Sequence, residues 1–288
     1  MQALHTPLND HLIWQIFCYL RSYMSMYDYD SVKLLISPGI QVIVSSMFED
    51  TFSAYINVIK SLSIKSILSL FSGGRDSLVV LHISKKVSEV LGVELKALHV
   101  DTTVSTPGNL EYVQEICKDL KVELVVLRPK YDFFTLVERW GFPTPKRRWC
   151  CYHLKIEPLK EYFKNINTSG ALVVDGIRAE ESWRRRGFPK LGYHKHFKCL
   201  NYHPIFEWTK KQVQNYIEMN NLKVNPLYSV LPRVTECWCT AFKTISQFKT
   251  LKREFPELFQ RFLEAEAKLR TGGSALFKNR RRIYLKDL

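Results

Sequence analysis

Residues 72–77 read Ser-Gly-Gly-Arg-Asp-Ser and join a short apolar run to a helical pattern. Glycines let the backbone approach an anion closely, and the N–H groups at the start of a helix bind phosphate or sulfate oxygens. The side chains add hydroxyl donors, a positive charge, and a carboxylate that can hold Mg²⁺ or orient the loop. We therefore predict an anion-binding loop whose members are Ser72, Gly73, Gly74 and Ser77, with Arg75 and Asp76 as the catalytic residues.

The alternative interpretation of this loop is a tight turn in which the glycines serve geometry alone. The predicted strand before it and the predicted helix after it favour the anion site. The loop lacks the Gly-Lys-Ser/Thr ending of a P-loop, which disfavours a generic nucleoside triphosphatase.

Four of the seven cysteines form two tight pairs. Cys150 and Cys151 are adjacent, and a disulfide between neighbours is strained. Cys237 and Cys239 are separated by one tryptophan. Without a secretion signal, paired cysteines favour metal or cluster ligation over structural disulfides. Four thiolates can ligate either a four-iron four-sulfur cluster or a zinc ion. The third alternative is that these cysteines hold no metal. Of the other cysteines, Cys18 and Cys117 are expected in the core, and Cys199 is isolated in the sequence.

An alternation of strands and helices is expected to position these residues. The predicted strands are Ser66–Phe71, Val93–Val100, Val122–Leu127 and Ala171–Asp175. The predicted helices are Ser77–Val90, a helix capped by Thr106 that ends at Leu120, and Thr209–Asn220. This pattern predicts an α/β fold with a parallel twisted sheet and helices on both faces. Because ligands of such sheets bind at the carboxyl ends of the strands, the loop, Asp101 and the segment after Asp175 are expected on one edge.

The flanking regions are expected to be mainly helical. Apolar residues recur at helical spacing from Asn9 to Met24 and from Met47 to Leu62, on either side of a turn at Pro38-Gly39. One or two helices are predicted from Ser246 to Leu269, before a basic ending that includes Arg280, Arg281 and Arg282. We therefore divide the chain into a helical segment at 1–62, an α/β domain at 63–245, and C-terminal helices with a basic tail at 246–288.

The composition narrows the class of protein. A formal net charge of +14 attracts polyanions, so nucleic acid is a candidate partner, beside small phosphate or sulfate esters. The same charge also fits an organism whose proteins are generally basic. No run approaches the roughly 20 apolar residues that cross a bilayer, and the first residues lack the pattern of a secretion signal. A cytoplasmic protein without a membrane partner is expected.

The loop at 72–77 resembles the signature of the PP-loop family, which includes ATP pyrophosphatases, sulfonucleotide reductases and tRNA thiolation enzymes. Three further segments, in family order over about residues 64–245, resemble its phosphoadenylyl-sulfate (PAPS) reductase branch, which is similar to DNA-phosphorothioation proteins. They are His99-Val100-Asp101-Thr102-Thr103 with Pro107, Asp175-Gly176-Ile177-Arg178-Ala179-Glu180-Glu181-Ser182 with Arg184 to Arg186, and His203-Pro204-Ile205 with Trp208.

The resemblance implies a Rossmann-like fold that binds ATP with Mg²⁺, or a related adenine nucleotide. Asp101 and Thr102 then contact the nucleotide. Arg178 presents a fork suited to sulfate or phosphate, and Glu181 is expected to pin it. The three arginines from Arg184 to Arg186 are either ligands or a solvated face.

For the cysteines, the resemblance favours an iron–sulfur cluster, because in the family a Cys-Cys pair and a distant Cys-x-x-Cys pair hold one. The second pair here, Cys237-x-Cys239, is one residue shorter. A zinc site and a vestigial site without metal therefore remain the alternatives to a cluster.

Two functions are weighed first. In family reductases a C-terminal cysteine attacks the sulfonucleotide, and no cysteine follows Cys239 in these residues. This favours an ATP-dependent, pyrophosphate-releasing sulfur-transfer enzyme that acts on tRNA or DNA, with a sulfur donor protein as a further partner. The alternative is a sulfonucleotide reductase-like enzyme, for which Cys199 is the spare thiol. A non-catalytic nucleotide-binding subunit of a larger oligomer ranks third.

Overall fold

The computed structural model describes residues 38–231, 237–269, 276–278 and 281–288. The chain forms two compact units, Met1–Asp50 and Thr51–Leu288. The expected helix at Asn9–Met24, Cys18 and Arg280 lie outside the described residues. Helix α3 (Pro38–Ser61) runs from the first unit into the second. The predicted turn at Pro38-Gly39 is wrong, because the helix begins there, with proline at a first position where its missing N–H costs nothing.

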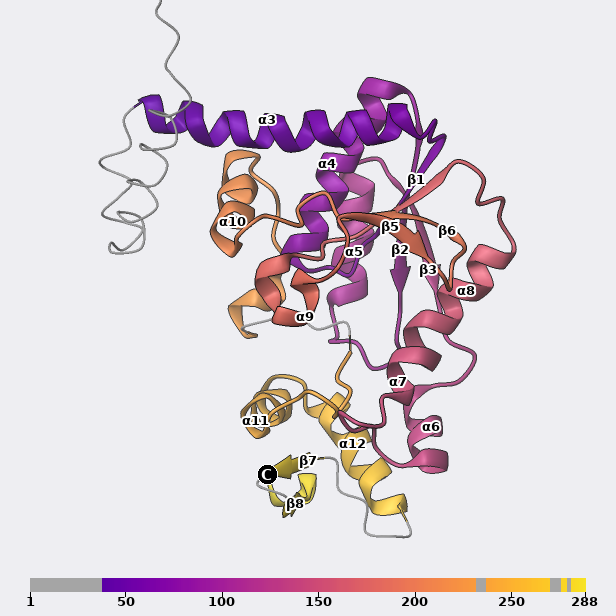
Figure 1. The fold of residues 1–288 in the computed structure, drawn as a ribbon. Helices are drawn as coiled ribbons and strands as arrows, with labels where there is room; N and C mark the ends of the chain where they lie inside the picture. Colours follow the sequence, from indigo (N-terminus) through magenta and orange to yellow (C-terminus); the bar gives the residue numbers. More distant parts are fainter. Residues whose placement is uncertain (1–37, 232–236, 270–275, 279–280) are drawn as a thin grey trace, which may run out of the picture. The chain divides into compact units, whose positions relative to one another are not determined.

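The second unit is built on a six-stranded sheet in the order β3-β2-β1-β4-β6-β5 (Figure 1). All neighbouring strands are parallel except β5, which pairs antiparallel with β6 at the edge. The predicted α/β fold class is confirmed, and the pair β5–β6 is an addition to the four predicted strands. The strands are β1 (Ser66–Leu70), β2 (Glu94–Val100), β3 (Glu123–Leu127), β4 (Ala171–Val174), β5 (Leu191–His194) and β6 (Cys199–Tyr202).

Helices connect the strands and cover the sheet. They are α4 (Arg75–Leu91), α5 (Asn109–Asp119), α6 (Phe133–Trp140), α7 (Trp149–Cys151), α8 (Glu157–Lys164), α9 (Trp183–Arg186) and α10 (Lys210–Met219). The expected cap of α5 is wrong. Gly108 occupies that position with a left-handed backbone, because the Thr106 hydroxyl accepts a hydrogen bond from the Trp238 indole at 2.9 Å instead.

Two cores lie on opposite faces of the sheet. Leu78 and Leu81 of α4 pack with Ala97 of β2 and with the buried face of α5. Leu68 and Leu98 point the other way and pack on α8. Successive residues of a strand face opposite sides, so covering both sides explains why these strands carry apolar residues on both faces.

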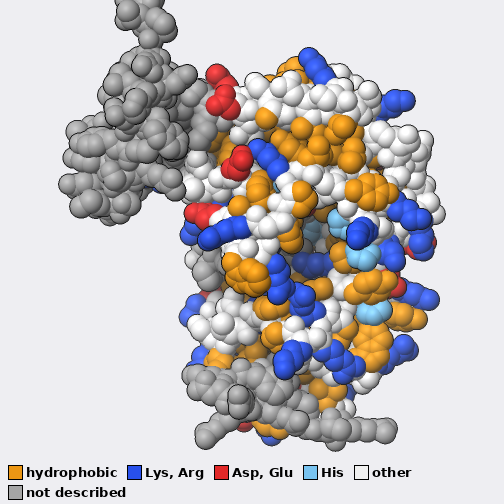
Figure 2. Space-filling view, in the orientation of Figure 1, with side chains coloured by type: hydrophobic (Ala, Val, Ile, Leu, Met, Phe, Trp, Pro, Cys, Tyr) orange, Lys and Arg blue, Asp and Glu red, His pale blue; other side chains and the backbone are white. Residues whose placement is uncertain are grey.

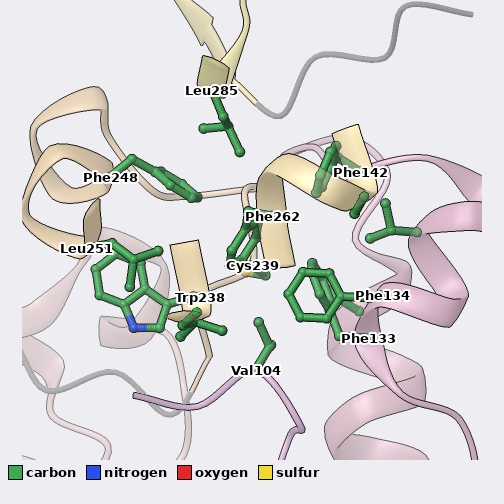
Figure 3. Close-up of a cluster of buried hydrophobic side chains, with 14 of the residues drawn as sticks. Val104, Phe133, Phe134, Phe142, Trp238, Cys239, Phe248, Leu251, Phe262 and Leu285 are labelled. Atoms are coloured by element: carbon green, nitrogen blue, oxygen red, sulfur yellow. The ribbon is translucent and has the colours of Figure 1, made fainter. Parts of the chain in front are cut away.

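A third core joins α6 to the C-terminal helices α11 (Ile245–Glu254) and α12 (Pro256–Lys268). In Figure 3, Cys239 lies among the aromatic side chains of Phe134, Trp238 and Phe262. The two helices expected around Pro256 are therefore confirmed. The hairpin β7 (Leu276–Lys278) and β8 (Arg281–Ile283) follows. Among the described helices, none has the length and apolar character to cross a membrane.

Candidate functional site

The glycine loop lies between the end of β1 and the start of α4. Glycine is required at two positions, one in the loop and one in the segment that packs against it. Gly73 has a φ of +86°, and a Cβ there would lie 2.3 Å from Oδ1 of Asn109. Gly176, in the segment after β4, approaches the loop so closely that a Cβ would lie 2.8 Å from the Asp76 carbonyl carbon and 2.9 Å from the Ser77 nitrogen. The two strand ends therefore meet backbone against backbone.

The loop hydroxyls hold one another in place. Oγ of Ser72 and Oγ of Ser77 lie 2.9 Å apart, and the Ser77 hydroxyl donates to the Gly74 carbonyl at 3.0 Å. The Tyr228 hydroxyl accepts from the Arg75 backbone nitrogen at 3.1 Å. Its ring lies 4.0 Å beneath the Arg75 guanidinium carbon. Among the described residues, the buried Nε of Arg75 has no hydrogen-bond partner.

Arg178 is the buried cation of the site, with 6% of its surface exposed. Its guanidinium donates to Asp76 Oδ1 at 2.8 Å, to Glu180 Oε2 at 2.6 Å, and to the Trp208 carbonyl at 3.2 Å. The expectation that Glu181 pins this guanidinium is wrong. Glu181 pairs with Arg185 and accepts from the Arg178 backbone nitrogen at 3.3 Å, because Asp76 and Glu180 already hold the fork.

These groups line a cavity of about 810 Å³ at the carboxyl ends of β1 and β4. Three further cations line it from different elements: Lys155, Arg185 and Lys210. Asp175 also lines it, and its Oδ1 accepts from Nδ1 of the buried His203 at 2.7 Å. Such a volume is in the range of small-molecule sites, and the cations give it affinity for an anionic ligand.

Three residues predicted to bind the nucleotide do not line this cavity: Gly73, Asp101 and Thr102. Asp101 follows β2, but its carboxylate accepts from Arg128 Nε at 3.1 Å and from the Thr103 backbone nitrogen at 3.0 Å. Thr102 is buried, with its hydroxyl 3.2 Å from that of Ser105. Their role in nucleotide binding stays a prediction.

The structure brings the four paired cysteines together. The Cys150 thiol hydrogen-bonds with those of Cys151 and Cys239, and the Cys237 thiol with that of Cys239. The segment that carries the second pair is fixed by the backbone nitrogen of Trp238, which donates to the Val104 carbonyl at 2.8 Å. Within the described parts of the chain, however, no group of three or more His, Cys, Asp or Glu side chains has metal-binding geometry.

The thiols differ in their protonation equilibria. Hydrogen bonds from Cys150 and Cys237 lower the pKa of Cys239, and a hydrogen bond from Cys150 lowers the pKa of Cys151. The positive charge of Lys155 also acts on Cys151. Since Lys155 lines the cavity as well, the thiols and the cavity share one cation.

Sequence reasoning missed Asn109, Asn225 and Tyr228, which support the loop from behind. The Asn225 amide donates to the Gly73 carbonyl at 3.2 Å and to Asn109 Oδ1 at 3.0 Å. Asn225 precedes Pro226, a pattern typical of a helix start, and this was the available signal. His194 ends β5 and lines the cavity, whereas His196 lies in the following turn.

The sequence model of the family described as the phosphoadenosine phosphosulfate reductase domain matches residues 66–241, which is more than half of the chain. The chain belongs to this family. The resemblance to the PAPS reductase branch of the PP-loop family is thereby confirmed. The match includes the glycine loop, Arg178 and all four paired cysteines.

Relatives within the family differ in length. An uncharacterized protein of Methanocaldococcus jannaschii is 31% identical over 198 residues, which are 67% of this chain and 46% of that protein. Adenosine 5'-phosphosulfate reductase of Bacillus cytotoxicus is 25% identical over 166 residues, covering 55% of this chain and 66% of the reductase. The chain thus spans less than half the length of the archaeal relative.

A solved structure supports the fold. FMN adenylyltransferase of Candida glabrata, in complex with FAD and inorganic pyrophosphate, matches with a TM-score of 0.51 at 14% identity. The match covers 73% of this chain and 66% of the adenylyltransferase. At this identity the likeness shows the shared fold alone.

Proposed function

We propose that this chain is an adenine-nucleotide-binding enzyme that uses ATP to activate an acceptor group on nucleic acid and then transfers sulfur to it. One observation carries the proposal: a cavity in which the glycine loop meets Arg178, Lys155 and Lys210. A triphosphate needs close backbone contact and several cations, and this cavity offers both.

The proposed reaction has two displacements. In the first, an acceptor oxygen attacks the α-phosphorus of ATP, a bond from that oxygen to phosphorus forms, and the bond to the leaving pyrophosphate breaks. In the second, a hydrosulfide sulfur delivered by a donor protein attacks the acceptor carbon, the bond from that carbon to the activated oxygen breaks, and AMP leaves with that oxygen. Negative charge grows on pyrophosphate during the first step, so fixed donors at that position lower the barrier.

We assign the pyrophosphate to the backbone and hydroxyls of Ser72, Gly74 and Ser77, which line the cavity, and to Gly73 the shaping of the turn between them. Arg75 and Asp76 are the proposed catalytic residues. Because Asp76 Oδ1 accepts a hydrogen bond from Arg178, we propose that Asp76 orients that guanidinium toward phosphate. The other carboxylate oxygen, Oδ2, takes no part in this hydrogen bond. Mg²⁺ bound with ATP supplies charge neutralisation, and the cavity carboxylates Asp76 and Asp175 have the oxygen donors it prefers.

The four paired cysteines are the proposed ligands of a [4Fe–4S] cluster. The four thiols form one chain of contacts, from Cys151 through Cys150 and Cys239 to Cys237. Four such thiols have the donor chemistry that this cluster requires. The cations Arg148, Lys155 and Lys243 favour thiolates there. Zinc is the alternative ligand of the same donor set.

A sulfonucleotide reductase-like activity is the second candidate, supported by the similarity to adenosine 5'-phosphosulfate reductase. Cys199, the thiol considered for its nucleophile, counts against it. The side chain is 3% exposed in the core under α8, and burial raises its pKa to about 11. A thiol in that state is a poor nucleophile.

Calorimetry on anaerobically purified protein tests the assignment, with Mg²⁺-ATP, adenylyl sulfate and phosphoadenylyl sulfate as ligands. Preferential ATP binding, with pyrophosphate released in the presence of an acceptor RNA or DNA, supports sulfur transfer. Preferential binding of a sulfonucleotide contradicts it and favours the second candidate. Binding of ATP without any turnover points to a nucleotide-binding subunit.

A further inference from the structure

One aromatic side chain beside the cavity is almost fully exposed. Trp183, the first residue of α9, has 79% of its surface accessible. Tryptophan is large and mostly apolar, so its exposure on an ordered turn is a cost unless a ligand covers it. The turn is ordered: the Ser182 carbonyl accepts from the Arg185 nitrogen at 3.1 Å, and the Arg185 carbonyl accepts from the Phe188 nitrogen at 2.9 Å.

Cations surround this tryptophan. The Arg184 guanidinium carbon lies 5.8 Å from the centre of the Trp183 ring, and Arg186 is exposed as well. In the described part of the chain, no carboxylate forms an ion pair with Arg184 or Arg186. Figure 2 shows Lys and Arg side chains beside hydrophobic ones over this part of the surface.

The same short helix connects this surface to the cavity. Arg185 lines the cavity together with Glu181, and Trp183 stands two residues before it. Two residues correspond to about 200° of rotation on a helix, so the two side chains leave α9 on nearly opposite sides. A strand bound over Trp183 would therefore have to pass around α9 to reach the cavity that Arg185 lines.

We propose that residues 183–188, which we call the α9 surface, bind single-stranded nucleic acid, with one base stacked on Trp183 and the phosphates on Arg184 and Arg186. The inference deepens the proposed function, because it identifies where the acceptor strand lies. Aromatic faces bind unpaired bases with little regard to sequence, and unpaired arginines bind phosphates. A duplex hides its base faces, so stacking selects single strands.

The test uses the full-length protein and fluorescein-labelled single strands of about 12 nucleotides, within the usual site size of single-strand binders. RNA and DNA of the same sequence are compared with the matching duplex at one fixed salt concentration. The variants are Trp183→Ala, Trp183→Phe, which keeps an aromatic face, and Tyr131→Ala. Tyr131 is the matched control: it is exposed and lies near Lys130 and Arg139, but it stands outside the α9 surface.

Trp183→Ala should weaken single-strand binding about tenfold, the change expected from the loss of one base stack of roughly 1.4 kcal/mol. Trp183→Phe should lose much less, Tyr131→Ala should match the wild type, and duplex binding should change little with any variant. Stronger binding of RNA than of DNA, or the reverse, identifies which of the two nucleic acids the α9 surface binds.

Unchanged single-strand binding by Trp183→Ala overturns the inference, as does an equal loss for single strand and duplex. Loss of binding to vesicles of anionic lipid with unchanged oligonucleotide binding assigns the surface to a membrane and overturns it too. Calorimetry with Mg²⁺-ATP is run on each variant. A protein that binds strands through Trp183 but never binds ATP refutes the proposed function and leaves the α9 surface standing.

Discussion

Nε of Arg178 donates to Oδ1 of Asp76 at 2.8 Å, although the two residues are 102 positions apart in the chain. Asp76 belongs to the first turn of α4, and Arg178 follows β4. The contact therefore joins the ends of two neighbouring parallel strands and aims a buried guanidinium at the glycine loop. A site assembled across strand ends in this way depends on both partners, because the Asp76 carboxylate neutralises the charge of the buried Arg178 guanidinium.

Replacing Arg178 by alanine should lower both stability and nucleotide affinity. We expect a loss of about 2 kcal/mol in the free energy of unfolding, less than the ~3–5 kcal/mol of fully buried pairs, because the Asp76 and Glu180 side chains are 33% and 49% exposed. Urea unfolding measures the first effect and calorimetry with ATP the second. Arg128→Ala is the control, since it breaks the surface pair with Asp101 and should cost under about 1 kcal/mol. Equal effects of the two variants would contradict the role given to Arg178.

Gly176→Ala should weaken ATP binding at least about tenfold, because the new Cβ meets the backbone of Asp76 and Ser77 and must displace the loop. Gly92→Ala is the matched control. Gly92 has a φ of +66° but open space around it, so alanine there adds about 1 kcal/mol of backbone strain without touching the site. Titration of both variants with ATP separates the two effects, and undiminished affinity in Gly176→Ala would show that the loop tolerates displacement.

The sheet was predictable because each of its first four strands carries apolar residues on both faces, which is typical of strands that are covered on both sides. The pair β5–β6 was harder to predict. Leu191 and Tyr193 of β5 are exposed at the sheet edge, so their pattern resembles a loop. The cap of α5 was mispredicted for a tertiary reason: Trp238, 132 residues away, takes the Thr106 hydroxyl.

The position of the glycine loop at the cavity was predictable, because a strand, two glycines and a helix start form a local sequence pattern. The partner of Arg178 was not. Glu181 is close to Arg178 in sequence, but Glu180 and the distant Asp76 hold the guanidinium. Asn225 and Tyr228 support the loop from a segment whose proximity only the folded chain reveals.

Alanine at Cys239 or Cys150 should remove bound iron and acid-labile sulfide from anaerobically purified protein, since each thiol is a member of the contact chain. Cys117→Ala should keep both, because Cys117 belongs to α5 and packs into the core on its buried side, away from the four paired cysteines. Elemental analysis and electron paramagnetic resonance measure the outcome. Stoichiometric zinc without iron in the wild type would show that the site binds zinc and not a cluster. No metal in any preparation would contradict the proposal of a metal site.

His82 should make stability depend on pH. Burial, aided by the charge of Lys86, lowers its pKa to about 4 in the folded protein. The unfolded chain therefore binds this proton first as the pH falls, so the contribution is complete above about pH 6.5 and is lost between about pH 6.5 and pH 4. After discounting for the partial exposure of the ring, we expect about 1 to 2 kcal/mol. Urea unfolding of the wild type and of His82→Gln at both pH values measures it, and parallel curves for the two proteins would contradict it.

The amide of Asn225 completes the glycine loop from 152 residues away, and this has a consequence for synthesis. Strands β1, β2 and β3 can pair as soon as the growing chain has passed Leu127, because the amino-terminal part of a chain emerges and folds first. The loop at that stage lacks Gly176, Arg178 and Asn225. Three of the six strands can thus pair before a nucleotide can be held, so ATP cannot assist these early strands and can only stabilise a chain that has been made past Asn225.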